Sequence, residues 1–201
     1  MIAIVDYGVG NLFSLVSSLK KIGADAVISG EEEVIRKADK IILPGVGAFR
    51  DAVKKLSDSG LKNIVIEECR KGKPLLGICL GMQMLFDKSY EDGEYEGLHL
   101  IPGSVRPISD VIPKGYKIPH IGWNKLDMKK ESMLFRFIKN GDYVYFVHSF
   151  YATDCEEFIT ATGEYGCPIT ASVEYKNVYG CQFHPEKSGE VGLNILRAFA
   201  L

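Results

Sequence analysis

The 201-residue sequence has little that would mark a secreted, membrane-bound or nucleic-acid-binding protein. No apolar run approaches the length of a transmembrane helix, and the start, Met1 to Asp6, lacks a basic segment and meets an acid too early for a signal peptide. The net charge of −2 provides no basic surface for nucleic acid or anionic lipid. Five cysteines, an odd number without a CxxC pair, argue against a disulfide framework and a zinc site. We therefore expect a reduced, cytoplasmic protein with no metal, membrane or nucleic-acid partner.

The composition is that of a globular chain, with 46% hydrophobic and 25% charged residues. At 201 residues the chain is long enough to bury a real core. It contains no repeat, low-complexity segment or linker. These features predict a single domain over residues 1–201.

Short apolar strands alternate with amphipathic helices in the first half. Residues 2–5, 26–28, 40–43 and 74–78 predict strands. Helices are expected where apolar residues recur at helical spacing, at Leu12, Leu15, Val16 and Leu19 and over 48–56, 61–70 and 80–86. This order favours a parallel sheet covered on both faces, with function at the carboxyl ends of its strands.

The second half predicts mostly strands, followed by one closing helix. The strands are expected at 143–147, 158–162 and 169–175, the last turning at Lys176 and Asn177. The closing helix places Val191, Ile195 and Phe199 on one face. The whole pattern predicts an α/β protein whose second half adds antiparallel strands to a mostly parallel sheet.

Cys79 stands in Gly77-Ile78-Cys79-Leu80-Gly81, between an apolar strand and a helix-like segment. This pattern is typical of a nucleophile elbow, in which flanking glycines give room to a strained turn. At a helix N-terminus the thiolate is favoured, and the N–H of Leu80 can face a developing oxyanion. A buried structural cysteine is the alternative interpretation.

His184 and Glu186 follow an apolar segment near the C-terminus and are separated by Pro185. Residues i and i+2 of a strand project to one side, so Glu186 could orient His184 as the base for Cys79. The order Cys, His, Glu differs from that of α/β-hydrolases and argues against that fold. Taken alone, the tripeptide could also be an ordinary strand end.

A third motif, Pro44-Gly45-Val46-Gly47, follows the strand at 40–43. Its glycines permit a close approach of backbone to ligand, and one of its N–H groups could be a second oxyanion donor if this strand lies beside the Cys79 strand. An ordinary turn is the alternative. Gly8 and Gly10 lack the third glycine of a dinucleotide fingerprint, so we predict no nucleotide site there.

Together the three motifs resemble the class I, or triad, glutamine amidotransferases over essentially the whole chain. The resemblance implies a flavodoxin-like α/β fold and glutamine as the substrate, with no cofactor and no metal. Four segments narrow this resemblance, namely 6–11, 119–124, 146–150 and 184–188. They are similar to glutaminase subunits that feed ammonia to a cyclase which makes imidazole glycerol phosphate and aminoimidazole carboxamide ribotide in histidine biosynthesis.

The resemblance implies a role for each site residue. Cys79, His184 and Glu186 would form a glutamyl thioester and hydrolyse it. The oxyanion hole would use Leu80, Val46 and Gly47, with a rearrangement of the 45–47 loop. Glutamine would be held by Gly45, Gln83, His148, Ser149 and Phe150. The partner would be contacted by Asn11, Trp123, Tyr145 and Lys187, although Trp123 and Tyr145 taken alone are more typical of core packing.

A partner is also expected on chemical grounds. Ammonia is protonated in water, so a glutaminase is useful when an acceptor captures its product, and this chain has no room for a synthase domain and no P-loop. The resemblance implies a (β/α)8-barrel cyclase that receives ammonia through a channel in a heterodimer. The alternatives are a glutaminase for vitamin B6, anthranilate or purine synthesis, a stand-alone cysteine hydrolase, and a binding module without catalysis.

Overall fold

A nine-stranded mixed sheet forms the centre of the computed structural model, which describes residues 1–201. The strand order is β2-β1-β3-β4-β13-β12-β11-β8-β9. Pairing is parallel from β2 to β13 and antiparallel from β13 to β9. The strands are β1 (Ile2–Val5), β2 (Ala26–Ser29), β3 (Lys40–Gly45), β4 (Leu75–Cys79), β8 (His120–Met128), β9 (Tyr143–His148), β11 (Ile159–Glu164), β12 (Pro168–Tyr175) and β13 (Val178–Cys181).

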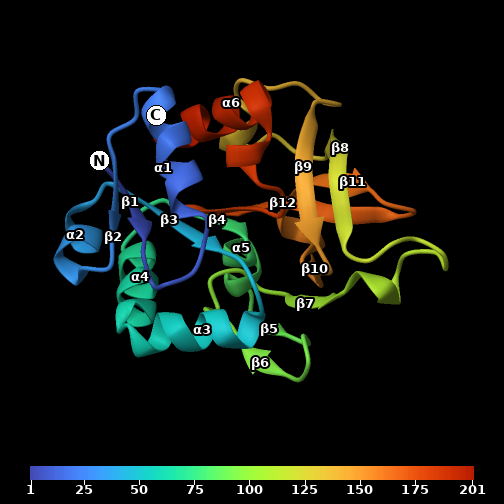
Figure 1. The fold of residues 1–201 in the computed structure, drawn as a ribbon, viewed down its shortest axis with the longest axis horizontal. Coiled ribbons are helices and arrows are strands. Elements are labelled where there is room, and N and C mark those ends of the chain that lie inside the picture. Colours follow the sequence, from blue (N-terminus) through green and yellow to red (C-terminus); the bar gives the residue numbers. More distant parts are fainter.

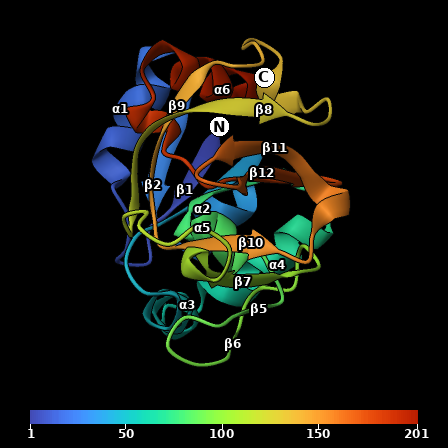
Figure 2. The same ribbon diagram turned by 90° about the vertical axis from the view of Figure 1, so that its right-hand side faces the viewer.

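A second, smaller sheet of four short strands has the order β10-β7-β5-β6. It lies on the same side of the central sheet as α3 (Figure 1, Figure 2). Its strands are β5 (Lys88–Ser89), β6 (Tyr95–Glu96), β7 (Ser104–Pro107) and β10 (Phe150–Thr153). The segment between β5 and β6 passes close to the start of α3, where the Glu91 carboxylate accepts a hydrogen bond from the Phe49 N–H at 2.7 Å.

Helices cover both faces of the central sheet. Figure 1 shows α1 and α6 on one face and α3 and α4 on the other. The helices are α1 (Leu12–Lys21), α2 (Glu32–Lys37), α3 (Phe49–Asp58), α4 (Leu61–Arg70), α5 (Leu80–Met84) and α6 (Gly189–Ala200), with 3-10 turns η1 (Ile108–Asp110), η2 (Met133–Phe135), η3 (Glu156–Phe158) and η4 (Pro185–Lys187). None of them is both long and apolar enough to cross a membrane.

Two hydrophobic cores lie on opposite faces of the sheet. One packs α3, α4 and α5 against the sheet and includes Phe49 and Phe86, both fully buried. The other packs α1 and α6, with Leu15, Leu19 and Phe199 buried. The apolar positions at helical spacing in α1 therefore face the core, as their periodicity predicts.

The predicted division of the chain is confirmed. The first half forms parallel β/α units, and the second half forms antiparallel strands that extend the same sheet. Five helices and strands were not predicted, namely α2, β5, β6, β7 and β10, and β8 was noticed only as a motif. The segment expected to be helical over 80–86 forms a helix only to Met84, because Leu85 and Phe86 turn away toward β5.

Candidate active site

Cys79 sits on a nucleophile elbow. It ends β4, it precedes the first residue of α5, and its φ of 55° and ψ of −114° are strained values for a residue with a side chain. Strain of this kind is stored at functional sites, where surrounding packing holds it in place. The elbow prediction is therefore confirmed by the backbone, and an unstrained structural cysteine does not fit this geometry.

The flanking glycines are required because three backbone segments meet at the elbow. A Cβ on Gly81 would lie 1.9 Å from the Leu43 carbonyl oxygen, and one on Gly77 would lie 2.7 Å from the Gly81 carbonyl oxygen. A Cβ on Gly45 would lie 2.7 Å from the Gly81 nitrogen. The elbow and the end of β3 can approach each other only with glycine at all three positions.

The glycine loop lies beside Cys79, as predicted. Strand β3 pairs in parallel with β4, and Gly45 is the register partner of Cys79. The loop is anchored by the buried hydroxyl of Tyr7, which donates to the Pro44 carbonyl oxygen at 2.7 Å. Gly47 has a φ of +90°, a value that an L side chain rarely adopts. These contacts place Val46 and Gly47 next to the nucleophile.

The helix after Cys79 is short. Because α5 has only five residues, its dipole contributes less than a full helix would. The N–H groups of its first turn still have no partner within the helix, and Leu80 is the first of them. An oxyanion at Cys79 would therefore meet an unpaired donor rather than a large macrodipole.

His184 and Glu186 form the expected pair, although not by the expected route. The Nδ1 of His184 lies 2.8 Å from Oε1 of Glu186, and both side chains are 4% exposed. The prediction that a strand delivers them is wrong, because β13 ends at Cys181. Pro185 instead starts the 3-10 turn η4, which folds Glu186 back onto the ring.

The surroundings of His184 favour its charged form. Burial alone would lower its pKa, but hydrogen bonds to Cys79 and Glu186 outweigh burial and raise the pKa from 6.5 to about 9. Two other cysteines have the opposite character, because burial raises the pKa of Cys69 to about 11 and that of Cys155 to about 12. Cys79 is thus the sulfur placed against a basic partner.

A pocket of about 440 Å³ opens in front of Cys79. Ten predicted site residues line it, and Glu91, Pro119 and Val147 join them without having been predicted. The predicted residues are Val46, Gly47, Cys79, Leu80, Gln83, His148, Ser149, Phe150, His184 and Lys187. A more open hollow of about 710 Å³ along residues 128–136 contains none of the triad.

Other predicted residues lie behind or beside this pocket. Gly45, Glu186 and Asn11 line a second void of about 10 Å³, which Val46 and His184 also line. Oε2 of Glu186 is buried and has no hydrogen-bond partner. Trp123 and Tyr145 line neither space.

The polar groups of Gln83 and His148 are largely used within the protein. Nε2 of Gln83 lies 3.0 Å from the Phe150 carbonyl oxygen and 2.9 Å from Oε1 of Gln182. Nδ1 of His148 donates to the same Phe150 carbonyl oxygen at 2.8 Å. Gln182, which was not predicted, directs Nε2 toward Sγ of Cys79 at 3.7 Å. Gln83 and His148 therefore fix the 147–150 segment as the pocket wall.

Glu91 is the main site residue that sequence reasoning missed. Its carboxylate lies in the pocket wall, between β5 and β6, where no motif marks it. Burial raises its pKa, opposed by the hydrogen bond from the Phe49 N–H and reinforced by Asp92 and Asp51. A carboxylate in the wall of the pocket that contains Cys79 is a signal that only the fold reveals.

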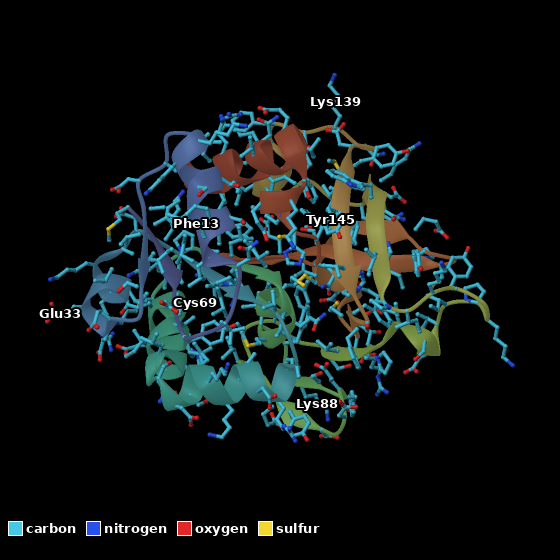
Figure 3. The ribbon with its side chains drawn as sticks, in the orientation of Figure 1. Phe13, Glu33, Cys69, Lys88, Lys139 and Tyr145 are labelled. Carbon is cyan, nitrogen blue, oxygen red and sulfur yellow. The ribbon has the colours of Figure 1, made fainter.

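Three of the four residues expected at a partner interface, Trp123, Tyr145 and Lys187, lie together. Trp123 on β8 pairs with Tyr145 on the edge strand β9, and their rings are 5.9 Å apart. Lys187 lies over the Tyr145 ring at 5.9 Å, and Asn11 is exposed at the start of α1. Trp123 is 52% exposed, so the interpretation of this residue as core packing is wrong. Figure 3 shows Tyr145 on β9 among these strands.

Comparison with known proteins places this geometry in a family. Residues 3–201 match the family model described as glutamine amidotransferase class-I. The chain is 52% identical over 200 residues to the imidazole glycerol phosphate synthase subunit HisH of Caldanaerobacter subterraneus subsp. tengcongensis, a match covering 99% of this chain and 97% of that protein. It is 49% identical over 201 residues to the subunit of the same name from Wolinella succinogenes, covering 99% and 98%.

Solved structures support the fold at lower identity. A crystal structure of a glutamine amidotransferase matches with a TM-score of 0.76 and 18% identity, covering 100% of both chains. The structure of PurLQS from Thermotoga maritima matches with a TM-score of 0.75 and 19% identity, covering 98% of this chain and 96% of that one. The chain therefore belongs to the class I glutamine amidotransferases and, within them, to the HisH subunits of imidazole glycerol phosphate synthase.

Proposed function

We propose that the chain hydrolyses glutamine to glutamate and ammonia with Cys79, His184 and Glu186. The observation that carries this proposal is the strained elbow, which presents Cys79 to His184 at the wall of a pocket of about 440 Å³. A nucleophile, a base and an orienting carboxylate in contact are what acyl transfer through sulfur requires. Similarity to the HisH subunits supports glutamine as the acyl donor.

In the first half of the reaction, Sγ of Cys79 attacks the side-chain amide carbon of glutamine. The raised pKa of His184 means that the ring holds the proton released by the sulfur. The oxyanion that forms is stabilised by the N–H of Leu80 and by an N–H of the Val46–Gly47 segment. His184 then gives its proton to the amide nitrogen, the carbon–nitrogen bond breaks, and ammonia leaves a glutamyl thioester.

In the second half, water attacks the thioester. The neutral His184 takes a proton from the water, the oxyanion forms again in the same place, and the carbon–sulfur bond breaks to release glutamate. Glu186 keeps Nδ1 of His184 protonated throughout, so Nε2 always faces the reacting atoms. No cofactor is needed for either step.

Recognition of free glutamine requires partners for both charges of its amino-acid group. We assign the α-ammonium to Glu91, whose carboxylate lines the pocket. Ser149 lines the same pocket and can donate to the α-carboxylate. A carboxylate in this position favours a free amino acid over a glutamine residue within a peptide, because a peptide has no α-ammonium there.

Ammonia is proposed to pass to a (β/α)8-barrel cyclase that makes imidazole glycerol phosphate and aminoimidazole carboxamide ribotide in the cytoplasm. The relatives are named as subunits of a synthase, which supports a partner of this kind. The outward face of β8 and β9 carries exposed Ile121, Trp123 and Tyr143. The same face continues into Val147 and Lys187, which line the pocket. A partner docked there would cover the pocket mouth and receive the product before water protonates it.

A glutamine analogue with an electrophilic carbon in place of the amide tests the chemistry directly. We expect it to alkylate Cys79 and leave the four other cysteines unmodified, as read by mass spectrometry of peptides. A matched analogue without the α-ammonium is expected to react at least tenfold more slowly, which separates a glutaminase from a general cysteine hydrolase. Equal labelling by both analogues, or labelling at Cys69 or Cys155, would contradict the proposal.

A further inference from the structure

We infer that the His120–His148 pair carries three ring protons, one more than two neutral imidazoles have. The pair therefore has a single positive charge, which lies at the wall of the glutamine pocket. His148 lines the pocket, while His120 lies behind it and touches no substrate. His120 is therefore a positioning residue that acts through His148. The inferred role toward glutamine depends on the proposed function, but the proton count does not.

The two rings belong to an unbroken row of hydrogen bonds between two backbone carbonyls. At one end, Nδ1 of His148 lies 2.8 Å from the Phe150 carbonyl oxygen, and its Nε2 lies 3.0 Å from Nδ1 of His120. Nε2 of His120 lies 3.0 Å from Oδ1 of Asn124. At the other end, Nδ2 of Asn124 donates to the Glu164 carbonyl oxygen.

Counting protons along this row gives the charge. A carbonyl oxygen can only accept, so Nδ1 of His148 must carry a proton. The amide of Asn124 donates through Nδ2, so its Oδ1 accepts and Nε2 of His120 must also carry a proton. The contact between Nε2 of His148 and Nδ1 of His120 needs a third proton. Two neutral imidazoles supply only two protons, and with two the ring nitrogens would face each other as lone pairs at 3.0 Å.

Turning the Asn124 amide over would remove the need for the third proton, but at a cost. Nδ2 would then donate to His120, and Oδ1 would lie against the Glu164 carbonyl oxygen in place of a donor. The amide oxygen and the carbonyl oxygen can only accept, so without a proton between them they repel each other at this close contact. Within the protein, every contact of the row joins a donor to an acceptor only with three protons and a single positive charge.

Aromatic rings cover both faces of His120. The Phe146 ring stacks on it at 5.0 Å with an interplanar angle of 20°, and the Tyr165 ring stacks at 4.0 Å with an angle of 22°. A cation between two aromatic faces is stabilised by their quadrupoles, whereas a neutral imidazole gains less. The aromatic rings therefore stabilise a charged His120 on its two faces, and the hydrogen bonds stabilise it at the ring edge.

Burial works against the charge. It lowers the pKa of His120 and, with the charges of His120 and His184, lowers the pKa of His148 to about 4, against the hydrogen bond to the Phe150 carbonyl oxygen, which raises it. The other titratable groups around the pair are Tyr165 and, in edge contact with it, Tyr116. Because only the acceptors and aromatic faces offset burial, the proton is held only while the row is intact, and removing one acceptor is expected to release it.

The charge has a defined place in glutamine recognition. Glu91, Lys187 and His184 lie in the wall of the same pocket, so the shared proton adds to the positive charge that can face the carboxylate of a zwitterionic amino acid, while Glu91 can face its ammonium group. The protonated Nδ1 of His148 also fixes the Phe150 carbonyl that accepts from Gln83. Loss of the shared proton would weaken the attraction for the α-carboxylate and loosen this wall.

Nitrogen-15 NMR of the ring nitrogens counts the protons without any substrate. The chain has four histidines, so single His→Gln variants assign every signal, and the exposed His99 serves as a reference outside the pair. We expect three protonated nitrogens in the His120–His148 pair between pH 6 and 7, with one lost as the pH rises. Two protonated nitrogens throughout pH 5 to 8 would overturn the inference.

Asn124→Leu supplies the matched test, because leucine has a similar size but no acceptor. The pH at which the third proton is lost is expected to fall by about 1–2 units, as for a lost hydrogen bond to a charged group. In glutaminase assays at pH 7, the KM for glutamine is expected to rise about 3–10-fold with little change in kcat. His99→Gln should change neither value. An unchanged titration in a folded Asn124→Leu would contradict the inference, even if no glutaminase activity were found.

Discussion

Glu186 and Cys79 set the protonation of His184 through contacts that exist only in the folded chain. Its pKa is raised from 6.5 to about 9 in the fold, so the folded state holds this proton more tightly than the unfolded state. The resulting stabilisation is fully present below about pH 6.5 and is lost as the pH rises through 9. The pH dependence of unfolding thus reports on the catalytic pair.

Glu186→Gln removes the carboxylate and keeps the shape. The difference in free energy of unfolding between wild type and variant is expected to be greatest near pH 6 and to shrink steadily toward pH 9, as measured by urea unfolding. Glu190→Gln, an exposed acid at the start of α6, is the control. A difference that stays constant from pH 6 to pH 9 would show that Glu186 does not govern the proton on His184.

Glu91→Gln tests the assignment of the α-ammonium. Hydrogen bonds to charged groups contribute about 1.5–3 kcal/mol, so the KM for glutamine is expected to rise about 10–100-fold with a much smaller effect on kcat. Steady-state kinetics measure this split. Glu94→Gln is the control, because Glu94 is exposed in the same loop and pairs with Lys88. An unchanged KM would remove Glu91 from glutamine recognition.

At the scale of elements, the close contact between the end of β3 and the elbow depends on glycine. Gly81→Ala would place a Cβ 1.9 Å from the Leu43 carbonyl oxygen, which the two backbones cannot relieve without moving. We expect a loss of more than about 3 kcal/mol in unfolding free energy, together with loss of activity. Gly23→Ala, with open space but a left-handed backbone, should cost about 1–2 kcal/mol. Equal costs for the two variants would contradict this account of the elbow.

The elements that sequence reasoning predicted are those with a local signature. The strands and helices of the first half alternate clearly, and α4 occupies the predicted residues. Helix α2 buries only Ile35, so its six residues give no readable periodicity. Strands β5 and β6 have two residues each and pair with each other, and two residues are too few for an alternating pattern to be recognised.

The candidate site divides in the same way. Cys79 and His184 lie in motifs whose chemistry can be read from neighbouring residues, so both were predicted. Glu91 and Gln182 reach the site only through the fold. The strand geometry assumed for His184 and Glu186 was wrong because Pro185 begins a 3-10 turn there, although the side-chain contact itself was predicted.

At the scale of the whole molecule, the exposed aromatic face of β8 and β9 is the surface that we expect a partner to cover. Trp123→Ala is expected to weaken binding to the cyclase subunit by at least about 2 kcal/mol, or roughly 30-fold, as central aromatic residues of interfaces do. Isothermal titration calorimetry measures this affinity. Phe137→Ala is the control, because Phe137 is an exposed aromatic outside this face. Equal effects of the two variants would locate the partner elsewhere.

Glutamate release from glutamine is the most direct test of the central claim. It is to be measured for the isolated chain, for the chain with a (β/α)8-barrel cyclase subunit, and for that complex with the ribonucleotide ligand of the cyclase, with Cys79→Ala as the control in each. The account predicts weak release by the isolated chain, a large increase only with the liganded partner, and none from Cys79→Ala. Release that is indifferent to the partner, or that persists without Cys79, would contradict it.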